Sequence, residues 1–569
     1  MTLMIPTLLL SLLLSPAPLQ ATLETQSATQ GQAPMQADPA VLVDRLFARW
    51  DRTVSPGSAL AVMKDGRIIY KRGYGMADLD HDVTITPATI FHVASVSKQF
   101  TAAAILLLEQ DGKLSIDDDV RKYVPELPDF GQRITLRHLL HHTSGLRDQW
   151  DLLGLAGWRY SLDLITDEDV LALMARQKDL NFKPGERHLY CNTGYTLLAQ
   201  VVKRVSGQSF RDFTTARIFA PLGMTRTHFR DDHAEIVKGI AYGYVPAGNA
   251  YKLSVTNFDT VGATSLLTTV EDLALWDENF YNPRVGGRAL IDRMLERGKL
   301  NDGRILDYAC GLTVGKYKGL NIVDHTGGDA GYRSDLIRFP DQHFSVACLS
   351  NVTNEPGSLA RQVADIYLAK ELKPEPAGTS DPGLKLPAEQ LAKMAGLYVN
   401  RQNDDLQWVF LLDGVLRGRQ TPAGAGVELR ALAENRFKPV GQAVEIRFEP
   451  TPSGGMRMIA APEGISKTNT YERAAEFKPT PAELAEYAGE YRSDEIEAVY
   501  RMVIRDGKLF LERLKSAPAQ LVPAVKDVFT GSQTSIRFAR DRRGRVTGFI
   551  LNRSRVLNFR FMKIAAPEK

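Results

Sequence analysis

The 569-residue sequence predicts an α/β (α+β) domain, built as an antiparallel sheet flanked by helices, followed by two small all-β domains of barrel type. Three observations predict this. Strand-like runs stand at both ends of residues 38–372, a stretch rich in Pro and Gly follows at 373–385, and the remaining residues contain an internal repeat. A chain of this length is too long for one hydrophobic core, so several domains are expected.

The first domain, residues 38–372, opens and closes with pairs of strand-like runs. The opening runs, SALAVMKDG and RIIYKRGYG, meet at Asp65-Gly66, a dipeptide typical of a two-residue hairpin turn. The closing runs are YRSDLIRFP and HFSVACLS. Amphipathic runs lie between them, and one of these, TLLAQVVKRVSG, stops at Gly207, a residue that commonly ends a helix. Strands at both ends with helices between them indicate one antiparallel sheet covered by helices.

The last two hundred residues contain two related copies, at 386–477 and 478–569. The triplets Gly-Leu-Tyr and Ile-Arg-Phe of the first copy recur as Gly-Glu-Tyr and Ile-Arg-Phe in the second, at nearly the same spacing. Each copy holds many short alternating runs bounded by turns, which predicts two small closed barrels or sandwiches.

The N-terminus predicts export. Residues 1–21 have the apolar run and small-residue cleavage region of a secretory signal peptide, although no Lys or Arg precedes the run. The polar residues 22–37 then predict a flexible linker. Elsewhere no segment is long and apolar enough to span a bilayer. We therefore expect a secreted or periplasmic protein with no membrane span in its mature chain.

Charge and ligand spacing argue against several classes of function. The formal net charge of +3 is too mild to favour nucleic acid or an anionic membrane as the main partner. The three cysteines lack the spacing of a metal site or a disulfide framework. His138 and His142 stand four residues apart, but no H-E-x-x-H pattern or carboxylate ligand accompanies them, so we expect them to pack or to cap. We expect no cofactor and no metal.

The segment FHVASVSKQFTAAAILLLEQ places Ser95 at the start of a helical pattern, with Lys98 three residues on and on the same face. A serine hydroxyl needs a nearby base to become a nucleophile, and a desolvated lysine can be that base when its pKa falls. The helix N-terminus also presents N–H groups to developing negative charge. A capping serine followed by a surface lysine would give the same spacing. We predict Ser95 as an acylated nucleophile that Lys98 activates.

A second motif, Tyr190-Cys191-Asn192, lies on a predicted loop before a helix. Tyr190 could relay the proton, and Asn192 could hold the lysine and donate to a substrate amide. The same Y-x-N pattern recurs at Tyr398, but the internal repeat makes Tyr398 a framework residue.

A third motif, His325-Thr326-Gly327-Gly328, stands just before a predicted strand. Glycines at a strand edge let a substrate backbone approach closely. The N–H of Gly328, with that of Ser95, could form an oxyanion hole, and His325 would face the substrate. An ordinary tight turn with a solvated histidine would have the same sequence.

The order S-x-x-K, Y-x-N and H-T-G resembles that of the penicillin-recognising serine hydrolases, which include class C β-lactamases, D-alanyl-D-alanine carboxypeptidases and D-stereospecific aminopeptidases. The runs ITLRHLLHHTSGL, IFAPLGMTRTHF and TSLLTTVEDLALW are similar to the same superfamily. The resemblance covers residues 38–372 and implies a β-lactamase-like fold. It also implies Ser95 as the nucleophile and Lys98 and Tyr190 as base and acid. The residues implied to line the substrate are Asn192, His325, Gly327 and Gly328.

His325 stands where class C β-lactamases carry a lysine, and a largely neutral histidine binds a carboxylate less firmly. Two β domains after the catalytic one resemble the D-aminopeptidases, in which a loop of the last domain narrows the cleft. The resemblance therefore implies an aminopeptidase or amidase for D-amino-acid peptides and amides. By position, the Asp527 region is the candidate for that loop, although Asp527 matches Asn435 of the first repeat and an ordinary turn residue would have the same sequence.

Several alternatives stay open. Within the class they are a D-alanyl-D-alanine carboxypeptidase, an esterase or a β-lactamase, each acting on a small peptide, amide or ester. Outside the class, the chain could be a non-catalytic penicillin-binding or sensor protein with a relic site. The sequence also leaves open whether Lys98 or Tyr190 is the base, and the oligomeric state, with a dimer possible.

Overall fold

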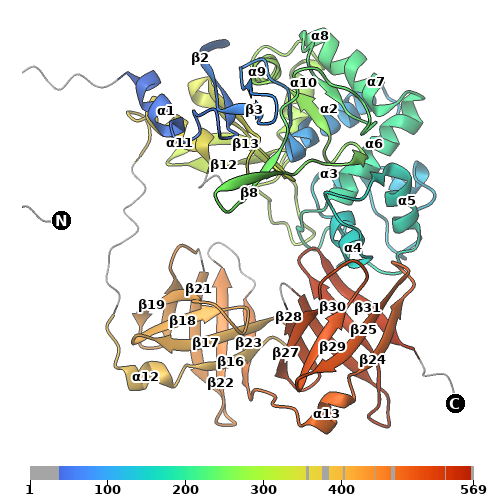
Figure 1. Ribbon diagram of the computed structural model, residues 1–569, viewed down its shortest axis with the longest axis vertical. Coiled ribbons are helices and arrows are strands. Elements are labelled where there is room, and N and C mark those ends of the chain that lie inside the picture. Colours follow the sequence, from blue (N-terminus) through green and yellow to red (C-terminus); the bar gives the residue numbers. More distant parts are fainter. Residues whose placement is uncertain are drawn as a thin grey trace, which may run out of the picture.

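The computed structural model describes residues 38–353, 358–373, 384–401, 404–442, 444–462, 468–531 and 534–564. The predicted signal peptide (1–21), the linker 22–37 and most of the linker 373–385 lie outside the described residues. The described residues form a domain of sheet and helices and two closed β-barrels, as predicted (Figure 1). None of the helices in these ranges is long and apolar enough to cross a membrane.

A six-stranded antiparallel sheet forms the centre of the first domain. Strands from the start of the domain pair with strands from its end, through β1 and β15. The order across the sheet is β12 (Thr313–Tyr317), β13 (Leu320–Asp329), β14 (Tyr332–Phe339), β15 (Phe344–Ser350), β1 (Ser58–Lys64) and β2 (Arg67–Tyr74). Asp65 and Gly66 both have positive φ, 50° and 73°, which a type I′ hairpin turn requires. The predicted sheet and hairpin are confirmed.

Each face of the sheet packs on helices because alternate strand residues point to opposite sides. β1 supplies Leu60 to one core, which it shares with the terminal helices α1 (Pro39–Phe47) and α11 (Leu359–Tyr367). It supplies Ala61 to the larger core on the other face, which contains α2 (Ser97–Gln110). All residues of α2 from its start to Leu108 are buried, so the N-terminus of this helix is held firmly in place.

A helical lobe lies at one end of the sheet (Figure 1). Its central helix, α6, packs along α2 and ends at Gly207, whose left-handed conformation (φ 72°) confirms the predicted stop. The helices of this side of the domain are α3 (Leu136–Leu140), α4 (Gln149–Leu155), α5 (Asp167–Ala175), α6 (Asn192–Ser206), α7 (Phe210–Thr214), α9 (Val270–Glu278) and α10 (Gly287–Met294).

The C-terminal part forms two eight-stranded antiparallel barrels, each closed by pairing of its first strand with its last. The first contains β16 (Gly396–Val399), β17 (Leu406–Leu412), β18 (Val415–Arg419), β19 (Val427–Ala433), β20 (Arg436–Pro439), β21 (Val444–Pro450), β22 (Met456–Pro462) and β23 (Asn469–Ala474). The second contains β24 (Gly489–Ser493), β25 (Ala498–Arg505), β26 (Lys508–Glu512), β27 (Ala519–Val525), β28 (Val528–Gly531), β29 (Thr534–Arg540), β30 (Val546–Arg553) and β31 (Val556–Lys563).

The internal repeat of the sequence is a repeat of structure. Tyr398 and Tyr491 occupy equivalent first strands, and each donates its hydroxyl to the main-chain carbonyl four residues earlier, at 2.8 Å. Tyr398 is therefore a framework residue, as the sequence predicted.

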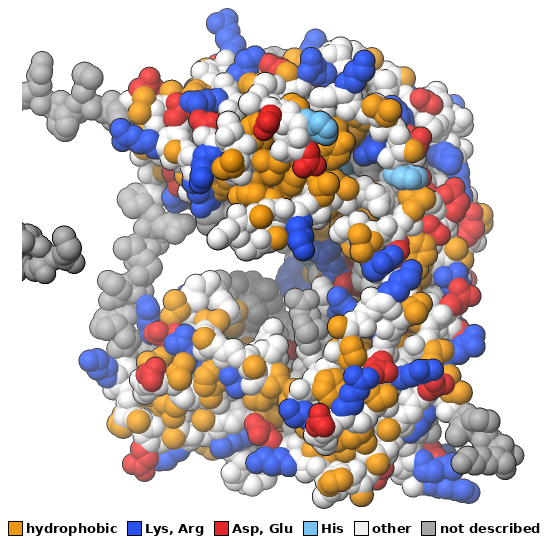
Figure 2. Space-filling view, in the orientation of Figure 1, with side chains coloured by type: hydrophobic (Ala, Val, Ile, Leu, Met, Phe, Trp, Pro, Cys, Tyr) orange, Lys and Arg blue, Asp and Glu red, His pale blue; other side chains and the backbone are white. Residues whose placement is uncertain are grey.

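The second barrel docks on the helical lobe. Arg147 and Glu495 form a buried ion pair of 2.7 Å across the junction, and Tyr500 donates its hydroxyl to the Leu155 carbonyl. The two barrels touch each other through apolar residues such as Trp408 and Val528. Figure 2 shows the second barrel against the first domain without a gap, whereas a hollow separates the first barrel from that domain. The second barrel is therefore the one that can contribute to a site in the first domain.

All three cysteines are buried and none forms a disulfide. Burial raises the pKa of Cys191 to about 12 and that of Cys310 to about 12. Cys348 lies inside the sheet on β15, as its apolar sequence context predicted.

Candidate active site

Residues from three distant motifs of the sequence line a single cleft of about 340 Å³. Ser95, Tyr190, Asn192, His325 and Gly328 all reach it. The three motifs that the sequence analysis singled out therefore meet in space, although up to 233 residues separate them, from Ser95 to Gly328.

Ser95 occupies a 3₁₀ turn (Ala94–Val96) directly before α2. Ala94 has a φ of 46°, a left-handed conformation that residues with a side chain seldom adopt, so the chain is strained next to Ser95. The flanking residues are buried, whereas Ser95 is half-buried and faces the cleft. This turn presents the hydroxyl to a substrate.

Lys98 lies beneath Ser95 and is fully buried. Its Nζ is 3.1 Å from Ser95 Oγ, 2.9 Å from Asn192 Oδ1 and 2.6 Å from the Ala263 carbonyl oxygen. Asn192 Oδ1 and the Ala263 carbonyl oxygen can only accept, so each takes one N–H of Lys98. The remaining tetrahedral position of Lys98 Nζ points at the Ser95 hydroxyl. Burial lowers the pKa of Lys98 to about 7, against the opposing effect of the Asp329 and Asp148 carboxylates. A neutral Lys98 would aim its lone pair at Ser95 Oγ.

Asp148 fixes the amide of Asn192. Its Oδ2 accepts from the main-chain N of Asn192 at 2.7 Å and from Nδ2 at 2.8 Å, which leaves Asn192 Oδ1 for Lys98. Asp148 also caps α4 by accepting from Trp150 N. No motif of the sequence singles out Asp148, although an Asp just before a helix is an ordinary capping signal.

Tyr190 stands beside the nucleophile with an unpaired hydroxyl. Burial raises the pKa of this phenol, and the neighbouring Ser95 hydroxyl opposes the rise. Its oxygen is buried and makes no hydrogen bond of ordinary geometry with any residue that the structure describes. The Lys98 ammonium lies 5.0 Å from the centre of the Tyr190 ring. The buried phenol of Tyr190 therefore keeps its proton next to Ser95.

The histidines of the HLLHH run cap a helix and pack beside the site. His138 completes a capping box with Thr135 at the start of α3. The buried ring of His142 packs 4.2 Å from that of Tyr190, and its Nδ1 accepts from Cys191 N at 3.1 Å. The predicted capping and packing roles are confirmed.

His325 is neutral. Its Nδ1 lies 2.6 Å from the Thr326 carbonyl oxygen, which can only accept, so Nδ1 carries the proton and Nε2 accepts from the Tyr308 hydroxyl at 3.1 Å. Burial, with the charge of Lys98, lowers the pKa of His325 to about 3. The residue that replaces the lysine of class C β-lactamases therefore supplies no cation to a substrate.

The two glycines after His325 have different parts. Gly328 is exposed and lines the cleft. Gly327 is not among the residues that line this cleft but lines a neighbouring cavity together with Thr326 and Gly328, so its contact with substrate stays a prediction. A Cβ on Gly327 would lie 2.3 Å from Ser334 Oγ, 2.3 Å from the Val93 carbonyl oxygen and 3.1 Å from Ser95 N. Gly327 thus lets β13 pass close behind the turn that carries Ser95.

We expect Gly327→Ala to lower kcat/KM by about 10²-fold, because the added methyl must push β13 away from the Ser95 turn. Gly328→Ala is the matched control. A Cβ there meets Arg333 at 3.4 Å or more, an ordinary contact, and the N–H that would face an oxyanion remains. Steady-state kinetics of both variants would check this, and equal losses would show that close packing at Gly327 does not hold the turn.

Asp329 gives the cleft an anion. His92 lies 2.9 Å from its Oδ2, and Tyr160 and Thr264 also donate to it. Burial alone would raise the pKa of Asp329, but these partners, His92 above all, lower it overall. The sequence alone does not point to Asp329, because its partners come from three separate segments.

The residue from the last barrel that lines the cleft is Arg555, in the turn between β30 and β31. Its guanidinium carbon lies 4.8 Å from the centre of the Tyr190 ring. The prediction that the Asp527 region supplies the loop that reaches the cleft is wrong. Asp527 accepts from Tyr487 and Arg540 within the second barrel, and its turn packs next to the first barrel instead.

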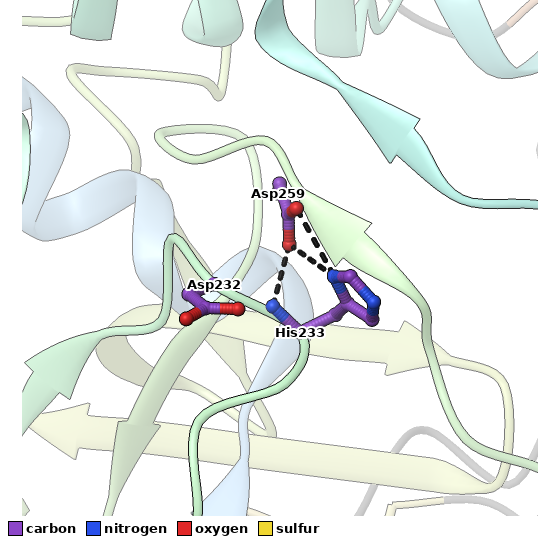
Figure 3. Close-up of side chains that lie close together, drawn as sticks. All are labelled: Asp232, His233 and Asp259. Atoms are coloured by element: carbon purple, nitrogen blue, oxygen red, sulfur yellow. Dashed lines mark hydrogen bonds and ion pairs between the residues drawn. The ribbon is translucent and has the colours of Figure 1, made fainter.

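One group of possible metal ligands occurs among the described residues, and none of its members lines the cleft: Asp232, His233 and Asp259 (Figure 3). Asp259 already accepts from the main-chain N of His233 at 2.5 Å and contacts its ring at 3.1 Å. These bonds fix the loop that carries His233.

Comparisons with known proteins agree with this geometry. A family model described as Beta-lactamase matches residues 42–371. The D-aminopeptidase of Gluconobacter oxydans is 26% identical over 80% of this chain and 84% of its own. Penicillin-binding protein 4* of Bacillus subtilis is 34% identical over 52% of this chain and 68% of its own. The solved structure of the octameric penicillin-binding protein homologue from Pyrococcus abyssi has a TM-score of 0.52 and 26% identity, over 76% of this chain and 99% of that one.

Proposed function

Because the chain belongs to the beta-lactamase family and is a serine hydrolase, we propose that it removes N-terminal D-amino acids from small peptides and amides through an acyl-enzyme on Ser95. The observation that carries the proposal is the buried Lys98, whose Nζ is 3.1 Å from Ser95 Oγ and whose other hydrogen-bonding directions are taken. Because its two other positions are occupied by acceptors, neutral Lys98 directs its lone pair at the Ser95 hydroxyl and can accept that proton.

Two observations favour a D-aminoacyl substrate. The match to the Gluconobacter protein named D-aminopeptidase spans 472 residues, more than the first domain contains, so it extends into the barrels. Asp329 supplies the cleft with an ionised carboxylate, which would attract the ammonium group of an N-terminal residue.

The groups have separate parts in the proposed reaction. Neutral Lys98 takes the Ser95 proton as Oγ attacks the substrate carbonyl carbon, and the N–H groups of Ser95 and Gly328 would stabilise the oxyanion. Burial raises the pKa of Tyr190, so the phenol is protonated before the reaction. It can then give this proton to the leaving amine, and Lys98 returns a proton to the phenolate. Water then attacks the acyl-enzyme by the reverse relay and releases the D-amino acid.

The test is the release of nitroaniline from D- and L-alanine p-nitroanilide. We expect the D-isomer to be hydrolysed with a kcat/KM at least about tenfold above that of the L-isomer. Labelling by a fluorophosphonate, measured in parallel, reports whether Ser95 is reactive. Labelling without release from either isomer would reject the aminopeptidase and keep the serine hydrolase, and equal release would reject the preference for the D-isomer.

A further inference from the structure

The turn Ser554–Arg555 of the second barrel is anchored to the first domain by its main chain. Arg555 N donates to Asp151 Oδ2 at 3.0 Å, and the Arg555 carbonyl oxygen accepts from Asn181 Nδ2 at 2.9 Å and from Asp148 N at 3.4 Å. The position of this turn over the cleft therefore does not depend on the Arg555 side chain.

The N–H groups of the Arg555 guanidinium are free to bind a ligand. Its one ionic neighbour among the described residues is Asp148, at a long 3.7 Å. The Asp148 carboxylate is already occupied by Asn192 and Trp150, and the Arg555 side chain is 38% exposed, on the cleft side of Tyr190. A planar guanidinium with free N–H groups is suited to bind a carboxylate with two parallel hydrogen bonds.

No other cation of the described part of the cleft is available for this contact. His325 is neutral, and the N–H directions of Lys98 are taken by Ser95, Asn192 and Ala263. Asp329, the anion of the cleft, has its own three donors. The cation that a substrate carboxylate meets in this cleft is therefore Arg555, while the Asp329 carboxylate would face a substrate ammonium.

We propose that Arg555 binds the free C-terminal carboxylate of a short peptide substrate, so that the second barrel supplies a carboxylate site to the cleft of the first domain. The inference rests on the proposed function and narrows it to peptides with a free carboxylate, such as D-alanyl-D-alanine. Amides and anilides remain substrates of lower kcat/KM, because they leave the guanidinium without a partner.

The experiment compares D-alanyl-D-alanine with the same peptide carrying a C-terminal amide. We expect the wild type to favour the acid over the amide by about 10- to 100-fold in kcat/KM, mainly through KM, as a charge-assisted pair would give. Arg555→Gln should reduce this ratio by about the same factor, and Arg555→Lys should restore part of it. Rates are compared at pH 9, because Arg555 also lowers the pKa of Lys98.

Arg553→Gln is the matched control. Arg553 belongs to the same strand-turn segment and lies 3.7 Å from Asp151, but it does not line the cleft, so the variant should keep the wild-type ratio. A ratio that stays high in Arg555→Gln, or that falls equally in Arg553→Gln, would overturn the carboxylate site.

A second readout separates this inference from the proposed function. If neither peptide is hydrolysed while the fluorophosphonate still labels Ser95, the aminopeptidase proposal fails. Protection of Ser95 from labelling then measures binding of the two peptides directly. Protection by the acid at a concentration at least about tenfold lower than the amide, lost in Arg555→Gln, would support the carboxylate site. Equal protection by both peptides would overturn it.

Discussion

Replacing Ser95 with alanine is expected to abolish hydrolysis of D-alanine p-nitroanilide, with a fall in kcat of about 10⁴–10⁶-fold. The change removes the oxygen that forms the acyl-enzyme, while the 3₁₀ turn and the Lys98 contacts to Asn192 and Ala263 remain. Burst kinetics and fluorophosphonate labelling, followed by mass spectrometry, would measure the loss at the level of the covalent step.

Ser97→Ala is the control for this variant. Ser97 is a buried neighbour whose hydroxyl accepts from Leu266 N at 3.1 Å, and it does not line the cleft. The control should still be labelled, even if it unfolds at a lower temperature. Labelling that persists in Ser95→Ala and disappears in Ser97→Ala would show that Ser97, not Ser95, is the nucleophile.

Replacing Lys98 with methionine is expected to lower kcat/KM by about 10²–10⁴-fold, the usual contribution of a general base. Methionine fills similar space but cannot accept the Ser95 proton. Because Lys98 is fully buried, the change also leaves Asn192 Oδ1 and the Ala263 carbonyl oxygen without this donor, so thermal unfolding of the variant should be measured alongside its kinetics.

The pH profile distinguishes Lys98 from Tyr190 as the base. Burial lowers the pKa of Lys98 from its ordinary value to about 7, so the neutral amine forms as pH rises through 7. The wild-type kcat/KM should therefore rise about tenfold per pH unit below 7 and level off above it. Lys98→Met should lose this rising limb. A limb that appears only at alkaline pH would instead favour the Tyr190 phenolate, whose pKa burial raises.

The parts of the site that could be predicted from the sequence are those carried by short motifs. Ser95 and Lys98 share one helical turn, and Asn192 begins the next long helix, so local spacing already places their side chains. The sheet was predictable for a similar reason, since two strand-like runs joined by an Asp-Gly turn define a hairpin without reference to the rest of the chain.

The residues that were missed depend on contacts between distant segments. Asp148 matters because Asn192 folds back onto it, and Asp329 because His92 and Tyr160 converge on it. Gly327 and Gly328 belong to the same short motif, and the sequence does not distinguish their surroundings. Only the three-dimensional path of β13 shows that Gly327 faces the backbone behind Ser95.

The error over Asp527 has a physical cause. Both Asp527 and Arg555 lie in hairpin turns of the second barrel, and the sequence does not state which end of a barrel docks where. The β27–β28 turn carries Val525 and Val528, which pack against Trp408 of the first barrel, so this turn is occupied. The β30–β31 turn, which carries Arg555, reaches the cleft instead.

The three buried cysteines make the protein suited to site-directed labelling. Thiol reagents attack the thiolate, and the raised pKa of Cys191 and Cys310 keeps both thiols protonated at neutral pH, while Cys348 lies inside the sheet. The thiols of Cys191 and Cys310 will therefore react slowly with maleimide dyes in the folded protein, and Cys348, which lines a second cavity, would be replaced by serine for such work. A cysteine introduced at the exposed Ser554 would carry a single fluorophore beside Arg555, where its emission would follow the filling and emptying of the cleft in real time.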